Sequence, residues 1–367
     1  MNSLLDLRTP SLLLDRDRLE RNVRRMRERL ASKGVALRLH VKTAKNVEVA
    51  RLAIGADTGP ITVSTLAEAE YFISHGFTDI LYAVGIVPAK LARVIELRKR
   101  GIDLKVIVDS VEAARAAANA EVPALIEIDS DGHRAGIVPG DARLLEVAGA
   151  LGACCAGAMT HAGDSYNVRS VDAIRAVAAR EREAVVECAR HVRAAGITCN
   201  IVSVGSTPTA TFGESFEGVT EVRVGVYVFF DLVMAGLGVC AVDDIALSVL
   251  GSVIGHQRER QWIITDAGWM AMSRDRGTAN HAVDQGYGLV CDAHGRPHDD
   301  LIMVDANQEH GIIARRDGAP IDFSRFPIGS LVRVLPNHAC ATGAQHRAYH
   351  VLRGGRLAET WDRIGGW

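Results

Sequence analysis

The alternation of short apolar runs with helical patterns constrains this chain more than any other feature of its sequence. Eight strand-like runs cover residues 36–41, 61–64, 79–84, 104–108, 124–129, 155–160, 200–204 and 220–224. Such alternation is typical of parallel strands joined by helices, and eight strands are the number that closes a (β/α)8 barrel. We therefore predict an α/β fold with a TIM-type barrel, and an open doubly wound sheet is the alternative.

Helical patterns fill the intervals between these runs. They are expected at residues 46–55, 66–75, 88–100, 110–120, 142–152, 170–195 and 208–213. The longest of them has Ser170 as its N-cap and repeats apolar residues at helical spacing. Another helix, over residues 18–31, precedes the barrel with Asp15 or Asp17 as its cap.

The pattern changes near residue 246, where helical spacing becomes rare. Strand-like pieces separated by Gly, Pro, Asp and Asn clusters cover residues 247–253, 261–265, 288–290, 301–304, 311–314 and 331–335. This shift predicts a barrel domain with an N-terminal extension over residues 1–245 and a smaller β-rich domain over residues 246–367. Residues near the N-terminus are candidates to join the second domain.

The charge balance and the cysteine pattern narrow the classes of partner. Among 367 residues, 42 are Lys or Arg and 44 are Asp or Glu, so the formal net charge is −2. No basic excess points to nucleic acid or an anionic membrane as a partner. The start of the chain lacks the pattern of a secretory signal, no apolar run reaches about 18 residues, and the seven cysteines show no CxxC spacing. We therefore expect a cytoplasmic protein.

Chemically useful residues follow the predicted barrel strands, at the end where such barrels carry their active sites. Lys42 follows the first run, Arg134 the fifth, His161 and Tyr166 the sixth, and a Gly-Ser-Thr turn at 205–207 the seventh. These are the parts needed to hold an anionic cofactor that carries an aldehyde. For Lys42 alone, a solvated loop lysine is the simpler alternative.

The Gly-Ser-Thr turn has the most specific chemistry of this set. An apolar strand runs directly into it, Thr207 is suited to cap the following helix, and Pro208 suits the first helical position. Backbone N–H groups at such a helix start, with hydroxyls beside them, form an anion site suited to phosphate. The alternative is an ordinary, well-capped turn.

The sequence His338-Ala339-Cys340 is a candidate metal site in the β-rich region. In an extended conformation, residues two apart point to the same face, so the imidazole and the thiolate can converge on one ion. Both groups suit Zn²⁺ or a similar cation. His310 and Asp266 are candidates for further ligands or supporting contacts. The alternative is one buried cysteine beside a hydrogen-bonded histidine.

Six short motifs stand in order along nearly the whole chain: Leu39–Thr43, Thr62–Glu70, Glu127–Arg134, Thr160–Gly163, Asp266–Gly268 and Pro336–Cys340. Together they resemble the D-serine dehydratase and D-threonine aldolase family, whose members are fold-type III pyridoxal-phosphate enzymes built like alanine racemase. The longer runs 202–209, 225–233 and 266–278 look most like the branch of this family that dehydrates 3-hydroxyaspartate. The resemblance implies a barrel, a β-domain and a pyridoxal 5'-phosphate cofactor.

Roles for individual residues follow from the resemblance. Lys42 would form the Schiff base with the cofactor, and Arg134 would contact its ring oxygen. His338 and Cys340 would bind a divalent metal such as Zn, Mg, Mn or Co. The dehydratases of the family share this His-x-Cys pair, whereas the aldolases tend to offer a carboxylate as the second ligand. The other residues expected to bind the cofactor are His40, His161, Tyr166, Gly205, Ser206, Thr207 and Tyr227.

The expected reaction is elimination of water from a 3-hydroxy-D-amino acid. D-threo-3-hydroxyaspartate would give oxaloacetate and ammonia, and D-serine would give pyruvate. Lys42 would remove the α-proton, and the metal would act as a Lewis acid on the β-hydroxyl. Arg274 or Arg276 is suited to a bidentate contact with a β-carboxylate, and His310 is a further candidate substrate residue. For the two arginines, a surface loop with an Arg-Asp pair is the alternative.

Three other activities fit parts of the same pattern. A retro-aldol reaction on the same substrates would release glycine and an aldehyde. Racemisation would need an opposing base, for which Tyr287 is the candidate. A non-catalytic pyridoxal-phosphate carrier would share the barrel and the lysine, but it would leave the β-rich region unexplained. The resemblance also implies a homodimer.

Overall fold

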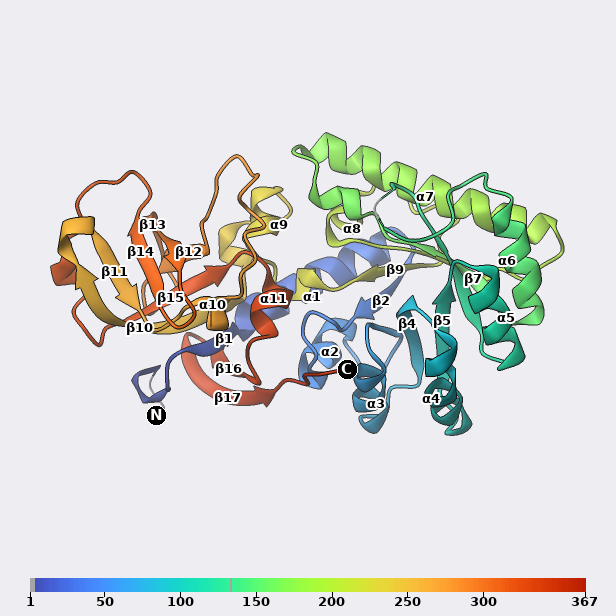
Figure 1. Cartoon of the computed structure of the whole chain (residues 1–367), viewed down its shortest axis with the longest axis horizontal. Helices are drawn as coiled ribbons and strands as arrows, with labels where there is room; N and C mark the ends of the chain where they lie inside the picture. The colour runs from blue at the N-terminus through green and yellow to red at the C-terminus, as the bar shows by residue number, and fades with distance from the viewer. Residues whose placement is uncertain (1–3, 133) are drawn as a thin grey trace. The chain divides into compact units, whose positions relative to one another are not determined.

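The computed structural model describes residues 4–132 and 134–367 and divides the chain into two compact units (Figure 1). One, called here the barrel unit, contains Val23–Gly225 and the last two residues. The other, called here the β-rich unit, contains the chain up to Asn22 and Val226–Gly365. The domain division at residues 245 and 246 stays a prediction.

Eight parallel strands form a closed barrel in the barrel unit, and β9 pairs with β2 to close it. The predicted barrel is therefore confirmed, and the open-sheet alternative is wrong. All eight strands lie where the sequence placed them. They are β2 (Ala36–His40), β3 (Ile61–Val63), β4 (Asp79–Gly85), β5 (Asp103–Val108), β6 (Ala124–Ile128), β7 (Cys155–Thr160), β8 (Ile201–Val204) and β9 (Glu221–Val224).

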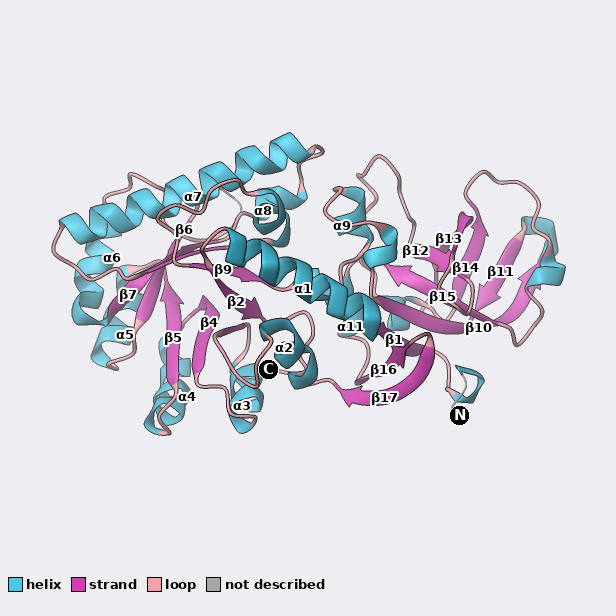
Figure 2. Ribbon diagram, turned by 180° about the vertical axis from the view of Figure 1, so that it is seen from behind, coloured by secondary structure: helices cyan, strands magenta, loops and turns pink. Residues whose placement is uncertain are grey.

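Helices connect successive barrel strands, as Figure 2 shows by its alternation of cyan and magenta elements. Ser170 caps the longest of them, its side chain accepting the N–H of Ala173 as predicted. They are α2 (Val47–Ile54), α3 (Leu66–Ser74), α4 (Pro88–Lys99), α5 (Val111–Asn119), α6 (Arg143–Leu151), α7 (Val171–Ala194) and α8 (Thr207–Phe212), with the 3-10 segments Gly152–Cys154 and Gly163–Tyr166.

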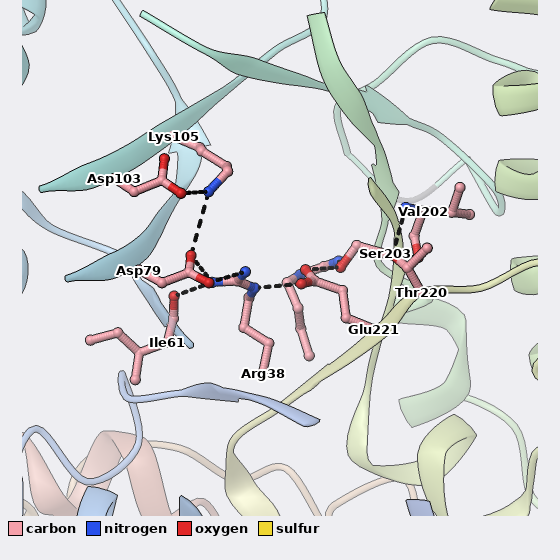
Figure 3. Close-up of polar contacts among 10 residues, drawn as sticks. Arg38, Ile61, Asp79, Asp103, Lys105, Val202, Ser203, Thr220 and Glu221 are labelled. Carbon is pink, nitrogen blue, oxygen red and sulfur yellow. Dashed lines mark hydrogen bonds and ion pairs between the residues drawn. The ribbon is translucent and has the colours of Figure 1, made fainter. Parts of the chain in front are cut away.

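The barrel interior combines an apolar part with a charged part. The apolar part is a buried cluster of Leu81, Ile107, Leu125 and Met159. The charged part centres on Arg38, whose Nε donates to Glu221 at 2.7 Å and whose two Nη atoms donate to Asp79 at 3.0 and 3.1 Å (Figure 3). Ser203 also donates to Glu221, at 2.7 Å. Because each of these charges has a partner, the interior avoids the cost of an isolated buried ion.

The β-rich unit holds nine strands in the order β11-β14-β13-β12-β15-β10-β1-β16-β17, and β11 also pairs with β10 to close a ring of six. The sequence pattern missed the last two strands, which form an antiparallel pair. The strands are β1 (Ser11–Asp15), β10 (Leu247–Gln257), β11 (Trp262–Thr265), β12 (Gly288–Cys291), β13 (Pro297–Ala306), β14 (Gly311–Arg315), β15 (Leu331–Pro336), β16 (Ala348–Arg353) and β17 (Arg356–Asp362).

Helix α1 (Arg16–Ser32) follows β1, and the carboxylate of Asp15 accepts the N–H of Arg18 at 3.0 Å. Within the described ranges, no helix combines the length and apolar character that crossing a membrane requires. The short helices of the β-rich unit are α9 (Leu232–Gly236), α10 (Trp269–Met272) and α11 (Ala339–Gly343), with the 3-10 segments Leu4–Asp6, Val226–Val228, Val242–Asp244, Arg258–Arg260 and Phe323–Arg325.

Candidate active site

Lys42 lies in the turn that follows β2, and its side chain is exposed. An ion pair fixes the far end of this turn, because Lys45 Nζ lies 3.0 Å from the buried carboxylate of Glu68. Glu68 also accepts the N–H of Ser64 at 2.7 Å. The turn that carries Lys42 is therefore tied to the next βα connection.

The charge of Lys42 acts on two histidines, which shows that these three side chains lie near one another. Burial, followed by the charge of Lys42, lowers the pKa of His161 to about 3. Burial and then Lys42 also lower the pKa of His40 well below its usual value. Both imidazoles are therefore neutral at pH 7. The barrel brings together residues that are about 120 positions apart in the chain.

His161 has a defined tautomer. Its Nδ1 lies 2.6 Å from the carbonyl oxygen of Gly205. A carbonyl oxygen only accepts hydrogen bonds, so Nδ1 carries the proton and Nε2 has a lone pair. Tyr166 ends the 3-10 segment after β7, and its ring centroid lies 6.2 Å from that of His161. The loops after β7 and β8 are thus joined through one imidazole.

Glu181, on α7, holds the same two loops and was missed from the sequence. Its Oε1 accepts the N–H of Ala162 and the N–H of Gly205, both at 3.0 Å. Burial raises the pKa of this carboxyl. A signal was present in the sequence, because Glu181 lies four residues from both Val177 and Val185 on the apolar face of the predicted helix.

The Gly-Ser-Thr turn starts α8, but its cap differs from the prediction. Ser206, not Thr207, is the N-cap, and it forms a capping box with Thr209. The hydroxyl of Ser206 is used in this cap, and it also contacts the hydroxyl of Ser165 at 2.8 Å. The chain turns one residue earlier than predicted, so Pro208 takes the second helical position and Thr207 the first.

Three buried polar atoms of the barrel unit test whether these residues fit pyridoxal phosphate. They are the hydroxyls of Thr207 and Thr62 and Nδ1 of His40, and none has a hydrogen-bond partner within residues 4–132 and 134–367. Buried polar atoms normally have partners, and a ligand rich in phosphate and ring oxygens would supply them. The residues present therefore fit the cofactor that the resemblance implies.

Two arginines add positive charge to this group of residues. Arg134 is exposed, lies 3.6 Å from Glu127 and contributes to the lowered pKa of His161. His133, its neighbour in the predicted motif, lies outside the described residues. Arg223, which the sequence analysis did not select, is buried on β9 and donates to Ser203 at 2.6 Å and to the carbonyl of Thr160 at 2.5 Å. An arginine inside an apolar strand was the signal for it.

His338 and Cys340 lie in the β-rich unit, but not on one extended segment as predicted. Only His338 is extended, whereas Cys340 lies in the first turn of α11. The prediction failed because it assumed that β15 continues through both residues, and β15 ends at Pro336. The two side chains nevertheless meet in a hydrogen bond. Helical curvature thus achieves the convergence that strand geometry was expected to give.

Asp275 supports His338 and was missed as a site residue. Its Oδ2 lies 2.7 Å from Nδ1 of His338, which leaves Nε2 of the ring for the hydrogen bond to Cys340. Burial lowers the pKa of His338, but the hydrogen bonds to Asp275 and Cys340 outweigh burial and raise this pKa to about 11. An imidazole beside a carboxylate and a thiol is a donor set that suits a divalent cation. The residues present therefore fit the implied metal.

Further ligands from the sequence analysis are placed differently. Both carboxylate oxygens of Asp266 are used, one accepting the N–H of Ser252 at 2.7 Å and the other the hydroxyl of Thr9 at 2.5 Å. His310 is exposed in the loop between β13 and β14. Within the described residues, no three His, Cys, Asp or Glu side chains gather as a metal site. The pair His338 and Cys340 stays a prediction as the metal ligands.

The remaining predicted residues also belong to the β-rich unit. Arg274 is exposed, and its guanidinium lies 5.2 Å from the ring centroid of Trp269. Arg276 pairs with Asp284 at 2.7 Å and lies 5.1 Å from the ring centroid of Tyr287. Tyr227 is fully buried in the 3-10 segment that follows β9. Their roles toward a substrate or cofactor stay predictions.

Comparison with known proteins assigns both parts of the chain. Residues 14–233 match the family model described as "Alanine racemase, N-terminal domain", and residues 246–352 match "Putative serine dehydratase domain". The chain is 52% identical to a D-threo-3-hydroxyaspartate dehydratase of Delftia sp. (strain HT23), over 100% of both chains. A D-serine dehydratase of Dictyostelium discoideum is 32% identical, over 95% of this chain and 94% of its own.

Solved structures and one aldolase complete the comparison. The Delftia dehydratase structure superposes with a TM-score of 0.98 at 52% identity, covering 100% of both chains. A cysteine-to-alanine mutant of D-threo-3-hydroxyaspartate dehydratase, described as "in the metal-free form", also gives 0.98, at 51% identity over 100% of both chains. A 3-hydroxy-D-aspartate aldolase of Paracoccus denitrificans (strain Pd 1222) is 30% identical, over 97% of this chain and 91% of its own.

Proposed function

The chain belongs to the alanine-racemase-like family of pyridoxal-phosphate enzymes that contains these dehydratases, and from this premise we propose that it removes water from a 3-hydroxy-D-amino acid. It is a carbon–oxygen lyase that releases ammonia. The preferred substrate is D-threo-3-hydroxyaspartate, which gives oxaloacetate, because the 52% identical relative is named for that reaction. D-serine, which would give pyruvate, is a second substrate to test.

The barrel unit supplies the groups for the cofactor. Lys42 would bind its aldehyde, and the turn at Gly205–Thr207 would hold its phosphate, with the buried Thr207 hydroxyl as a donor. Arg134, with its charge near His161, would face an oxygen of the cofactor ring. His40 and Tyr166 are proposed as further cofactor contacts of this unit, and Tyr227, which belongs to the β-rich unit, is proposed as another. Pyridoxal phosphate, when bound, supplies an electron sink for negative charge at the substrate α-carbon.

The chain's own residues handle the protons. Lys42 Nζ takes the α-proton of the substrate as the general base. His161 does not compete for this proton at neutral pH, because burial, the largest cause, holds its pKa well below its usual value. Its hydrogen bond to Gly205 keeps the ring in one orientation. The neutral imidazoles therefore shape the site while the lysine moves the proton.

The β-rich unit supplies the observation that carries the choice of reaction. Hydroxide is a poor leaving group, and loss of water needs Lewis-acid or proton assistance. His338 and Cys340 would hold a divalent cation that provides this assistance, and Asp275 fixes the imidazole that binds it. Zinc suits the thiolate and imidazole donors, while Mg, Mn and Co are the alternatives. Arg274, Arg276 and His310 are proposed substrate contacts.

Identification of the products tests this proposal. The purified protein, supplied with pyridoxal phosphate and a divalent cation, is incubated with D-threo-3-hydroxyaspartate and, separately, with D-serine and D-threonine. We expect ammonia with oxaloacetate from the first and no glycine. Glycine with glyoxylate would show the retro-aldol reaction instead, and bound cofactor without any product would favour a carrier. A homodimer and a cytoplasmic location are also proposed, and light scattering tests the first.

A further inference from the structure

Glu181 is a buried carboxyl that the proposed reaction does not use. It lies on the apolar face of α7 with Ile174, Val177 and Val185, and its exposed fraction is 2%. Placing a carboxylate on such a face costs free energy unless its oxygens accept hydrogen bonds. The position therefore calls for an explanation beyond the packing of the helix.

The hydrogen bonds of Glu181 converge on two barrel loops. One oxygen, Oε1, accepts both the N–H of Ala162 after β7 and the N–H of Gly205 after β8, each at 3.0 Å. The hydroxyl of Thr209 contacts the same carboxyl. A single side chain thus satisfies two backbone donors that lie beyond the paired residues of β7, β8 and β9.

These contacts close a ring through His161. The N–H of Gly205 donates to Glu181. The carbonyl oxygen of Gly205 accepts the Nδ1–H of His161, with 2.6 Å between the two heavy atoms. His161 in turn precedes Ala162, whose N–H also binds Glu181. Gly205 has no room for a side chain, because a Cβ there would lie 1.9 Å from the carbonyl oxygen of Arg223. The ring therefore fixes the imidazole and the start of the turn together.

We propose that Glu181 is a positioning residue that aligns His161 and the Gly205–Thr207 turn, and that it acts through the reach of its Oε1 atom rather than through its charge. The inference rests on the proposed function in taking pyridoxal phosphate as the ligand. An amide oxygen can accept the same two N–H groups, and the Thr209 hydroxyl can accept from an amide nitrogen. When the charge of Glu181 is removed, Arg223 still has the carboxylates of Glu221 and Glu127 as neighbours.

Two substitutions separate reach from charge. Glu181→Gln keeps the length and the oxygen but removes the charge, whereas Glu181→Asp keeps the charge but withdraws it by one methylene. Glu183→Gln is the matched control, because Glu183 is exposed on the same helix. The dissociation constant of pyridoxal phosphate is measured by absorbance on the full-length proteins, and thermal unfolding is recorded beside it.

We expect the loss of cofactor binding to follow the reach of the side chain at position 181. Glu181→Asp weakens cofactor binding at least about tenfold, from two lost hydrogen bonds, while Glu181→Gln stays within about threefold and the control is unchanged. Equal loss in both Glu181 variants would show that the charge is needed as well as the reach, and loss in Glu181→Gln alone would assign the effect to charge; either result would overturn the proposal. Wild-type affinity in Glu181→Asp would overturn it too. Should Glu181→Asp fail to fold, loss of binding in a folded Glu181→Gln still refutes the proposal.

A second readout does not depend on the cofactor. Nitrogen NMR of ¹⁵N-labelled histidine in cofactor-stripped protein reports which ring nitrogen of His161 carries the proton. We expect Nδ1–H in the wild type and Glu181→Gln, and a mixture of tautomers in Glu181→Asp. An unchanged tautomer in all variants would contradict the positioning role. If the wild type binds no pyridoxal phosphate, the proposed function fails, and this NMR result still tests Glu181 by itself.

Discussion

Two histidines of this chain sit in opposite electrostatic surroundings. His161 of the barrel unit has cationic neighbours, namely Lys42, Arg134 and Arg223, and its pKa falls to about 3. His338 of the β-rich unit has Asp275, Cys340 and Asp231 as neighbours, and its pKa rises to about 11. Burial disfavours the charged form of both rings, so the neighbours decide the difference.

The contrast indicates which ligand each unit is built to hold. Cations around a neutral imidazole leave a net positive region, which suits a phosphorylated cofactor. Anionic groups around an imidazole create the opposite field. A metal cation, when bound, can replace the proton that the ring holds when no metal is present. The surroundings of His161 in the barrel unit therefore suit an anion, and those of His338 in the β-rich unit suit a cation.

Lys42→Ala should have the largest effect, because it removes the proposed cofactor anchor of the barrel unit. We expect loss of the absorbance of lysine-bound cofactor and a fall in turnover of at least about 10³-fold, because both the covalent bond and the base are lost. Lys99→Ala, which removes an exposed lysine of α4, is the matched control. Turnover in Lys42→Ala close to that of the control would rule out Lys42 as the anchor.

Cys340→Ala should disrupt only the proposed metal site of the β-rich unit. Removing one of two protein ligands should abolish metal binding at micromolar concentrations and reduce ammonia release at least about 100-fold. The cofactor absorbance should stay. Metal content by plasma mass spectrometry and the absorbance spectrum check the two parts, with Cys154→Ala of the barrel unit as the control. Loss of cofactor together with the metal would show that the two sites are not separate.

Asp275→Asn should weaken the cation site without removing a ligand. The amide can still hold Nδ1 of His338 but lacks the negative charge, so we expect about 10–100-fold weaker metal affinity. Titration of the metal-free protein with zinc, followed by calorimetry, measures this change. Affinity equal to that of the wild type would mean that Asp275 only completes a surface hydrogen bond.

His161 should make the cofactor-free protein sensitive to acid. Its folded pKa is lowered from 6.5 to about 3, so the unfolded chain binds a proton below pH 6.5 that the folded chain does not. The free energy of unfolding therefore falls as pH falls, by up to about 2 kcal/mol between pH 6.5 and 5 from this residue. Urea unfolding at these two pH values, compared with His161→Gln, measures the difference. Identical pH dependence in the two proteins would contradict the lowered pKa.

The sequence predicted the barrel closely because its strands and helices differ in period and alternate along the chain. Lys42, His161 and the turn at Gly205 were selected together because barrel closure brings strand ends together whatever their separation in sequence. The β-rich unit was harder to predict. Strands β16 and β17 (Ala348–Arg353 and Arg356–Asp362) have weak alternation, and short helices such as α11 carry no periodic signal.

Supporting residues were the main omission at the site. Asp275 acts through a contact with His338, 63 positions away, and no local pattern marks such a pair. Glu181 and Arg223 did leave a signal, since Glu181 places a charge on the apolar face of a helix and Arg223 places one in an apolar strand. The shift of the N-cap from Thr207 to Ser206 was not predictable, because either hydroxyl can cap and a one-residue difference in the turn decides.

Chelation, read out at both sites in one sample, tests the central claim most directly. The wild-type protein, loaded with pyridoxal phosphate and zinc, is titrated with a chelator while absorbance and ammonia release from D-threo-3-hydroxyaspartate are followed together. We predict that ammonia release stops when the metal is removed, that the cofactor absorbance persists, and that added divalent cation restores turnover with oxaloacetate as the product. Undiminished ammonia release from metal-free protein, or glycine as the product, would contradict the account.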